Sequence, residues 1–288
     1  MKFTTLFLFL LLLAAASSSA QEVSGSIRLP NEGYTASYER LIRTAQADNA
    51  SSARWQAFLE THGSWQALWN EYTHTPYRVW GEGTQIPGYR RIDSANADAA
   101  ARGFIATMGD LLRCDGVELA LTDVNEYEGK WTVTYEQRFK GVPVLTSEVT
   151  VSMTTAGRVF LFGADVFPQL EVPVAPVISP DDAKAFAATG LVLPVGAAAA
   201  TVDGQLSILP YKSLAGVSHH LVYDVTLPQD EFHIWNTLVD ARTGAVLRRA
   251  NQIVDGIYGT VNSSVKSVSY AVPATNVAAS TMYVKVNG

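Results

Sequence analysis

The feature that most constrains the fold of this chain is a regular alternation of apolar and polar side chains over residues 131–139. One face carries apolar side chains and a glutamine, and the other carries threonine and charged side chains: Trp131, Val133, Tyr135, Gln137 and Phe139 against Thr132, Thr134, Glu136, Arg138 and Lys140. A period of two is expected of a strand with one buried face. Polar turns at Lys140 and Gly157 separate this strand from further apolar stretches. Residues 131–165 therefore predict an antiparallel meander of three strands.

A helix is predicted before this meander, over residues 96–113. Its larger apolar side chains share one face: Ala100, Phe104, Met108, Leu111 and Leu112. Asp93 or Ser94 is a candidate cap at its start. A helix laid across an antiparallel sheet is an α+β arrangement.

A second helix and sheet are predicted after a Pro- and Val-rich linker at residues 168–178. Ser179 can cap a helix in which Pro180 takes the first position. Four strands are expected after it, around residues 206–211, 217–226, 232–240 and 245–248. Before the last of them, Asp240 can hydrogen-bond the backbone of a turn that Gly244 closes with a positive φ.

The residues at the turns of the first meander resemble a known motif. Gln137, Gly141, Pro143 and Val144, with Gly157 in the next turn, are similar to the fungalysin/thermolysin propeptide family. Members of that family are pro-segments of secreted zinc metalloproteases.

The turn of the second meander, Asp240 to Gly244, is similar to the end of the PepSY domain that follows the first module in that family. The resemblance spans residues 75–251. It implies two helix-on-antiparallel-sheet (cystatin-like) modules that act as an intramolecular chaperone and temporary inhibitor of a catalytic domain in cis. It implies structural roles for the motif residues and zinc in that catalytic domain, with no catalytic residue, cofactor or metal ligand in this chain.

The N-terminal part combines a predicted leader with a tryptophan-rich segment. Residues 1–20 have the charged start, apolar run and small-residue end of a secretory signal peptide. Residues 21–50 are polar and predicted to be irregular. Trp55, Trp65 and Trp69 follow at spacings that favour short helices interrupted at His62–Gly63. We interpret these tryptophans as core or as a docking surface, in preference to a carbohydrate-binding face.

Composition limits the classes of partner. The net charge of −6 and the lack of a basic cluster argue against nucleic acid. No apolar stretch after the leader is long enough to cross a bilayer, so we expect a secreted chain without membrane contact. The single Cys114 cannot form an intrachain disulfide and is interpreted as a small buried hydrophobe.

No catalytic constellation is recognisable in the sequence. The five histidines include no H-E-x-x-H pair, and there is no G-x-S-x-G elbow or P-loop. His219 and His220 are adjacent on a predicted strand, where they point to opposite faces and cannot share a metal ion. Asn49 and Asn262 fit the glycosylation acceptor pattern.

The final residues predict further strands, at Gly256–Val261 and Tyr283–Val286, that are typical of the start of a β-sandwich. Asn287–Gly288 is a strong hairpin turn without a return strand, so we expect the natural chain to continue beyond it. The sequence predicts five segments: signal peptide 1–20, N-terminal helical and irregular region 21–95, first module 96–170, second module 171–252 and the start of a β domain at 253–288.

Two functions from different classes follow. The first is the propeptide of a secreted metalloprotease. The alternative is a free-standing secreted binding or protease-inhibitor protein. An enzyme with an unrecognised site is a third hypothesis.

Overall fold

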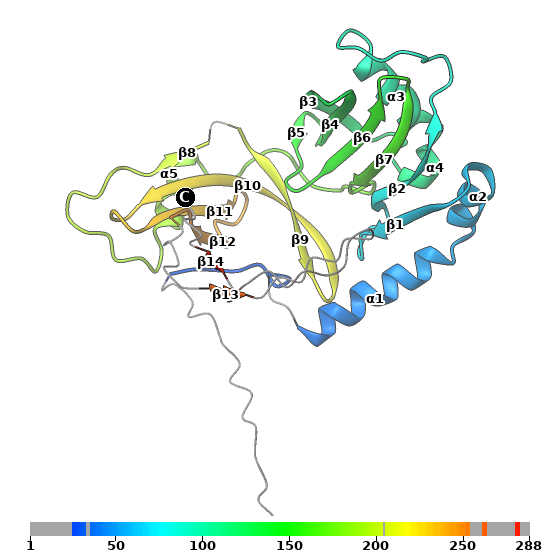
Figure 1. Cartoon of the computed structure of the whole chain (residues 1–288). Coiled ribbons are helices and arrows are strands. Elements are labelled where there is room, and N and C mark those ends of the chain that lie inside the picture. The colour runs from blue at the N-terminus through cyan, green and yellow to red at the C-terminus, as the bar shows by residue number, and fades with distance from the viewer. Residues whose placement is uncertain (1–24, 33–34, 204, 254–260, 264–279, 283–288) are drawn as a thin grey trace, which may run out of the picture.

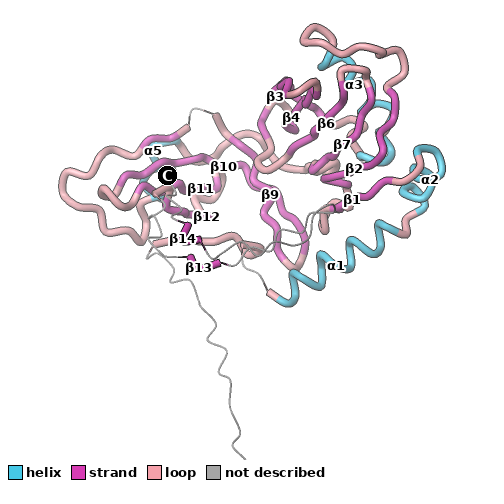
Figure 2. Tube along the Cα trace, in the orientation of Figure 1, coloured by secondary structure: helices cyan, strands magenta, loops and turns pink. Residues whose placement is uncertain are grey.

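The computed structural model describes residues 25–32, 35–203, 205–253, 261–263 and 280–282. The fold is α+β with antiparallel sheets, as predicted. Two modules, each built on its own sheet, lie side by side (Figure 1). Strands form the body of both modules, and helices cover parts of them (Figure 2).

The first sheet runs in the order β1-β2-β7-β6-β4-β3, with β5 beside β4. Its strands are β1 (Trp65–Trp69), β2 (Pro76–Gln85), β3 (Glu118–Tyr127), β4 (Lys130–Phe139), β5 (Val142–Pro143), β6 (Glu148–Thr154) and β7 (Arg158–Asp165). The meander β4-β6-β7 matches the prediction, and Val133, Tyr135 and Gln137 are buried on one face. However, β1 and β2 belong to this sheet, so placing residues 65–85 in a separate N-terminal region was wrong.

Three helices accompany this sheet: α2 (Ala53–His62), α3 (Ala97–Thr107) and α4 (Gly109–Leu112). The helix predicted over residues 96–113 is thus divided after Thr107, while its predicted face is buried. The tryptophan segment departs from the prediction, because β1 follows α2 where a second helix was expected. Trp65 and Trp69 are four residues apart, a spacing that places side chains on one face of either a helix or a strand.

Aromatic side chains fill the core between these helices and the sheet. The ring of Phe162 in β7 lies 5.0 Å from Phe104, 5.6 Å from Trp65 and 5.9 Å from Phe58, measured between centroids. Such tilted contacts are favourable beyond the area they bury.

The second module combines α5 (Pro180–Ala187) with β8 (Thr201–Val202), β9 (Ser207–Ser213), β10 (Gly216–Pro228), β11 (Ile234–Asp240) and β12 (Val246–Asn251). The strands run β12-β11-β10-β8, and β9 pairs with the other half of β10. Ser179 and Asp182 form a capping box at the start of α5, which confirms the predicted helix start. Ala183, Leu221 and Trp235 belong to the core of this module.

The N-terminal segment connects both modules. Ile27 pairs with Arg249 at the edge of the second sheet. The chain then runs through α1 (Ala36–Ala50) to the first module (Figure 1). The prediction of irregular structure over residues 21–50 was therefore wrong for α1. This helix buries only Tyr38, Ala45 and Asn49, so its sequence carries little apolar periodicity.

Short strands β13 (Val261–Ser263) and β14 (Ser280–Met282) pair antiparallel near the end of the chain. The predicted signal peptide, the strand at Tyr283–Val286, the turn at Asn287–Gly288 and nearly all of Gly256–Val261 lie outside the described residues. Within the described ranges, no helix has the length and apolar character needed to span a membrane.

Candidate functional site

Gln137 fixes the point where the chain leaves the first module. This glutamine sits near the end of β4 and is 3% exposed. Its Nε2 donates to the carbonyl of Phe167 at 2.8 Å, and its Oε1 accepts from the amide of Phe167 at 2.8 Å. Phe167 follows β7 and precedes the linker. The side chain thus satisfies both backbone groups of a buried residue that has no strand partner.

Gly141 and Pro143 form a hairpin with β4 that leads to Val144, and Val144 attaches the first module to the second. Lys140 and Gly141 have φ values of 51° and 78°, which two-residue hairpins of type I′ require. Val144 then donates its amide to Gln137 O at 2.9 Å. Its side chain is 3% exposed and belongs to the core of the second module. The predicted hairpin is confirmed, and it delivers a first-module residue into the other module's core.

Gly157 allows a close approach of two backbones in the first module. Its φ is 76°, and a Cβ at this position would lie 2.1 Å from the carbonyl oxygen of Tyr89. The carbonyl of Gly157 accepts the amide of Ile86 at 2.9 Å. Only glycine fits this turn without displacing the chain at 86–89.

Asp240 organises the last turn of the second module. Its Oδ1 accepts the amides of Arg242 at 2.9 Å and Thr243 at 2.8 Å. Its Oδ2 lies 2.7 Å from Nδ1 of His220. Burial disfavours the charged carboxylate, but hydrogen bonds from His220 and the turn amides outweigh it and lower the pKa of Asp240. Gly244 closes the turn with φ 75°.

The seven motif residues therefore do not converge on one chemical site. Gln137 and Val144 meet at the module junction, and Gly141 sets the hairpin between them, in which Pro143 pairs with Arg138 of β4. Gly157 sets a turn of the first module, and Asp240 and Gly244 set one turn of the second. Two residues of the junction were not predicted from the sequence: Phe167, whose backbone amide and carbonyl both bond the side chain of Gln137, and Leu145, whose amide donates to Ile208 O in β9. Their roles depend on long-range backbone hydrogen bonds, which leave no local signal in sequence.

The histidines lie in separate environments. His219 packs edge-on against Phe167 with centroids 5.7 Å apart, and burial, followed by the charge of His220, lowers the pKa of His219. His220 instead pairs with Asp240 from the opposite face, as strand geometry predicted. Among the described residues, no cluster of three or more His, Cys, Asp or Glu could hold a metal ion.

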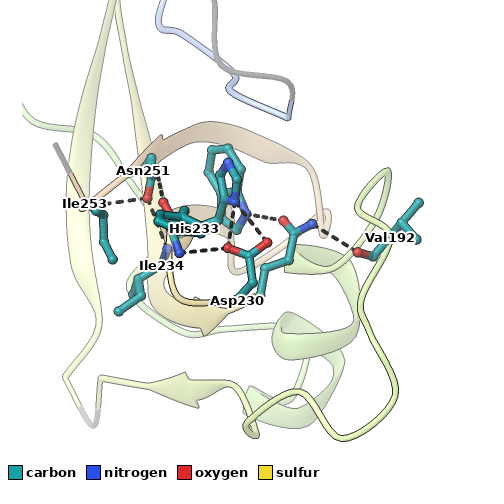
Figure 3. Close-up of polar contacts among 9 residues, drawn as sticks. Val192, Asp230, His233, Ile234, Asn251 and Ile253 are labelled. Carbon is teal, nitrogen blue, oxygen red and sulfur yellow. Dashed lines mark hydrogen bonds and ion pairs between the residues drawn. The ribbon is translucent and has the colours of Figure 1, made fainter. Parts of the chain in front are cut away.

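His233 belongs to a polar network at the end of the second sheet (Figure 3). Its Nδ1 lies 2.8 Å from Oδ1 of Asp230, and its ring stacks on Trp235. The amide of Phe232 holds the pKa of Asp230 below its usual range. Asn251 accepts the amide of Ile234 at 3.0 Å. These contacts bind the turn before β11 to the end of β12, which is a structural role.

The three tryptophans of the tryptophan-rich segment belong to the core, so their rings do not form a docking surface. Trp55, Trp65 and Trp69 are 5%, 6% and 1% exposed. Burial also raises the pKa of Cys114 to about 12, which is consistent with a small buried hydrophobe. Asn49 is 4% exposed and donates to the carbonyl of Ala45, so the folded chain cannot present it for glycosylation.

A cavity of about 240 Å³ lies at the module junction. Tyr72 and Arg113 line it from the first module, Val217 and His219 from the second, and Phe167 lies between them. None of the residues that line this cavity is acidic.

Comparisons with known proteins identify part of the chain. Residues 117–166 match the family model of the Fungalysin/Thermolysin Propeptide Motif. This range holds β3 to β7 and five of the seven motif residues. The match supports a propeptide domain.

No curated protein matches the chain. Among solved structures, the Bacillus megaterium YpeB C-terminal domain aligns at 16% identity with a TM-score of 0.32. The alignment covers 73% of this chain and 96% of that one. A TM-score this low does not establish a common fold.

Proposed function

We propose that this chain is the pro-segment of a secreted metalloprotease precursor, and that it assists the folding of a catalytic domain in cis and blocks that domain until removal. The match of residues 117–166 to the propeptide motif carries this proposal. Zinc and the catalytic residues belong to the catalytic domain. The leader at residues 1–20 would direct secretion, and the two modules would be cystatin-like, the second a PepSY domain.

The architecture suits a folding template. Val144 joins the core of the second module, and Leu145 donates its amide to Ile208 O in β9 at 2.8 Å. The N-terminal segment ties the modules together a second time through Ile27 and Arg249. A scaffold held at several points can present a fixed surface to a domain that would otherwise be trapped during folding.

Inhibition in cis follows from the same connection. A tethered domain meets its partner at high effective concentration, so a weak contact suffices to block a cleft before cleavage of the tether. After cleavage the same contact weakens by dilution, which makes the inhibition temporary.

Two observations test the proposal against a free-standing inhibitor or binding protein. The first is the reading frame after Gly288: an H-E-x-x-H in frame supports the pro-segment, and a stop codon supports the free-standing protein. The second is inhibition of the protease encoded there by the purified chain. If residues 21–252 leave its peptidase rate unchanged at a large molar excess, the inhibitory role is wrong.

A further inference from the structure

The edges of the second sheet are bound by other segments of the chain. At the β12 edge, Ile27 and Arg249 exchange two backbone hydrogen bonds, of 2.9 and 2.8 Å. On the other side, β8 is 2 residues long, and β9 accepts the amide of Leu145 at Ile208. Covered and short edges are the usual protection against unwanted strand pairing.

The first sheet has one bound edge and one open edge. At β1, the side chain of Gln46 donates to Trp69 O at 2.7 Å and accepts from its amide at 3.0 Å. At β3, the only outer backbone contact in the described part of the chain is from Arg102 to Leu119 O, at 3.5 Å. β3 is 10 residues long, so most of a full-length edge is open.

The register shows which β3 groups face outward. Gln137 in β4 directs its amide to Ser147 and its carbonyl to Val144, on the side away from β3. Its β3 partner Leu119 therefore directs its own amide and carbonyl away from β4. Along β3 the backbone amide and carbonyl of successive residues point alternately toward β4 and away from it, and the bulge between Leu121 and Asp123 shifts this alternation by one residue. Four residues therefore direct their backbone groups away from β4: Leu119, Leu121, Val124 and Glu126.

The open edge is strongly acidic. Residues 117–129 contain no Lys or Arg and four carboxylates: Glu118, Asp123, Glu126 and Glu128. Glu118 and Glu126 accept backbone amides of Gly141 and Gly129. Asp123 and Glu128 make no hydrogen bond or ion pair within the described ranges. Leu121 and Tyr127 beside them are 44% and 70% exposed, which adds apolar surface to the edge.

We propose that the edge of β3 is a docking site for an extended, Lys- and Arg-rich segment of a partner protein, which adds to the sheet as an antiparallel or parallel strand. Backbone hydrogen bonds would supply affinity and the acidic side chains would select basic partners. A second copy of the chain is disfavoured, because pairing two β3 edges sets carboxylates against carboxylates. Docking at this edge does not require the partner to be a protease domain.

A displayed library of random peptides of the length of β3 (10 residues) provides the probe. The chain from Gln21 is used as bait. We expect enriched peptides to alternate apolar residues with Lys or Arg. A synthetic copy of the most enriched peptide is then added to the chain, and amide hydrogen exchange measured by NMR shows where the peptide binds. The amides of Leu119, Leu121, Val124 and Glu126 should become protected, while those of Asp123 and Asn125, already bonded to β4, should not change.

Two matched double variants test the charge requirement. Asp123→Lys with Glu128→Lys should weaken binding of the basic peptide roughly five- to thirtyfold, because one favourable cross-strand pair at Asp123 and the attraction to Glu128 in the adjoining turn both become repulsive. Asp48→Lys with Glu60→Lys changes net charge equally at exposed positions on α1 and α2, and should leave binding within about twofold. All of these positions are on the surface or at the edge, so circular dichroism should show the native fold.

Three outcomes would overturn the proposal. One is enrichment of peptides without basic residues. Another is equal loss of binding in both double variants, which indicates nonspecific charge attraction. The third is a hydrogen-exchange result in which the bound peptide protects other amides but not those of Leu119, Leu121, Val124 and Glu126. Dimerisation of the chain through β3, seen as protection that rises with protein concentration, would identify the second copy as the occupant instead.

Discussion

Replacing Gly244 by alanine tests the turn that closes the second module. Its φ of 75° is strained for any residue with a Cβ, at a cost of about 1–2 kcal/mol. The added Cβ would also lie 2.5 Å from a ring carbon of Phe186 on α5. Overpacking of this kind costs roughly 1–3 kcal/mol, less where the neighbour can move, and Phe186 is 39% exposed. Reduced freedom of the unfolded chain offsets about 0.4–1 kcal/mol.

We therefore expect Gly244→Ala to lower the free energy of unfolding by about 1–3 kcal/mol, measured from urea midpoints. Gly190 provides the matched control, because its φ is 80° but nothing lies within 4 Å of an added Cβ. Gly190→Ala should cost only the conformational part, about 1 kcal/mol or less. The difference between the two variants measures the contact with Phe186.

A double variant separates strain from contact. Phe186→Ala in the Gly244→Ala background removes the steric contact between the added Cβ and the Phe186 ring. It should therefore restore the part of the unfolding free energy by which Gly244→Ala is less stable than Gly190→Ala. An unchanged urea midpoint for Gly244→Ala would refute the assigned turn. Equal losses at both glycines would refute the contact with α5.

Three further predictions concern the module junction, the stability of the fold at low pH, and catalysis. Gln137→Leu should destabilise the chain by about 2–4 kcal/mol, because it leaves the buried backbone amide and carbonyl of Phe167 without hydrogen-bond partners. A urea midpoint within error of the wild-type value would contradict this. The lowered pKa of Asp240 means that its carboxylate stabilises the fold above about pH 4 and loses this contribution as the pH falls through the folded pKa, so the stability gap between wild type and Asp240→Asn should narrow in acid. A difference in unfolding free energy between wild type and Asp240→Asn that stays constant from neutral pH to pH 3 would contradict this prediction. Purified residues 21–288 should hydrolyse no casein with or without zinc, and activity that survives repurification and is lost with chelator would show this to be wrong.

The parts of the fold that could be predicted from the sequence are those set by local periodicity and by turn residues. The alternation at Trp131–Phe139 specifies β4 because one face is buried, and the capping box at Ser179 specifies α5. Glycines with positive φ marked the turns at Gly141 and Gly244. These signals act within a few residues of the chain, so sequence alone conveys them.

The rest depends on contacts between distant segments. β1 was assigned as helix because Trp65 and Trp69 fit both periods, and its pairing with β2 decides between them. α1 carries little apolar pattern, since it is held in part by the hydrogen bonds of Gln46 to the backbone of Trp69. Motif residues could be identified from sequence, but Gln137's partner Phe167 lies 30 residues away and could not.

Refolding in trans tests the pro-segment function most directly. A catalytic domain, where the same reading frame encodes one, is denatured and diluted into buffer with residues 21–252, or with Gly244→Val and Gln137→Leu forms as matched controls. If the chain is a pro-segment, the wild-type segment should raise the yield of folded domain and inhibit its peptidase activity until the segment is removed. The variants that loosen the scaffold should have smaller effects. Equal yield and equal activity with and without the segment would contradict the pro-segment function and favour an independent binding protein.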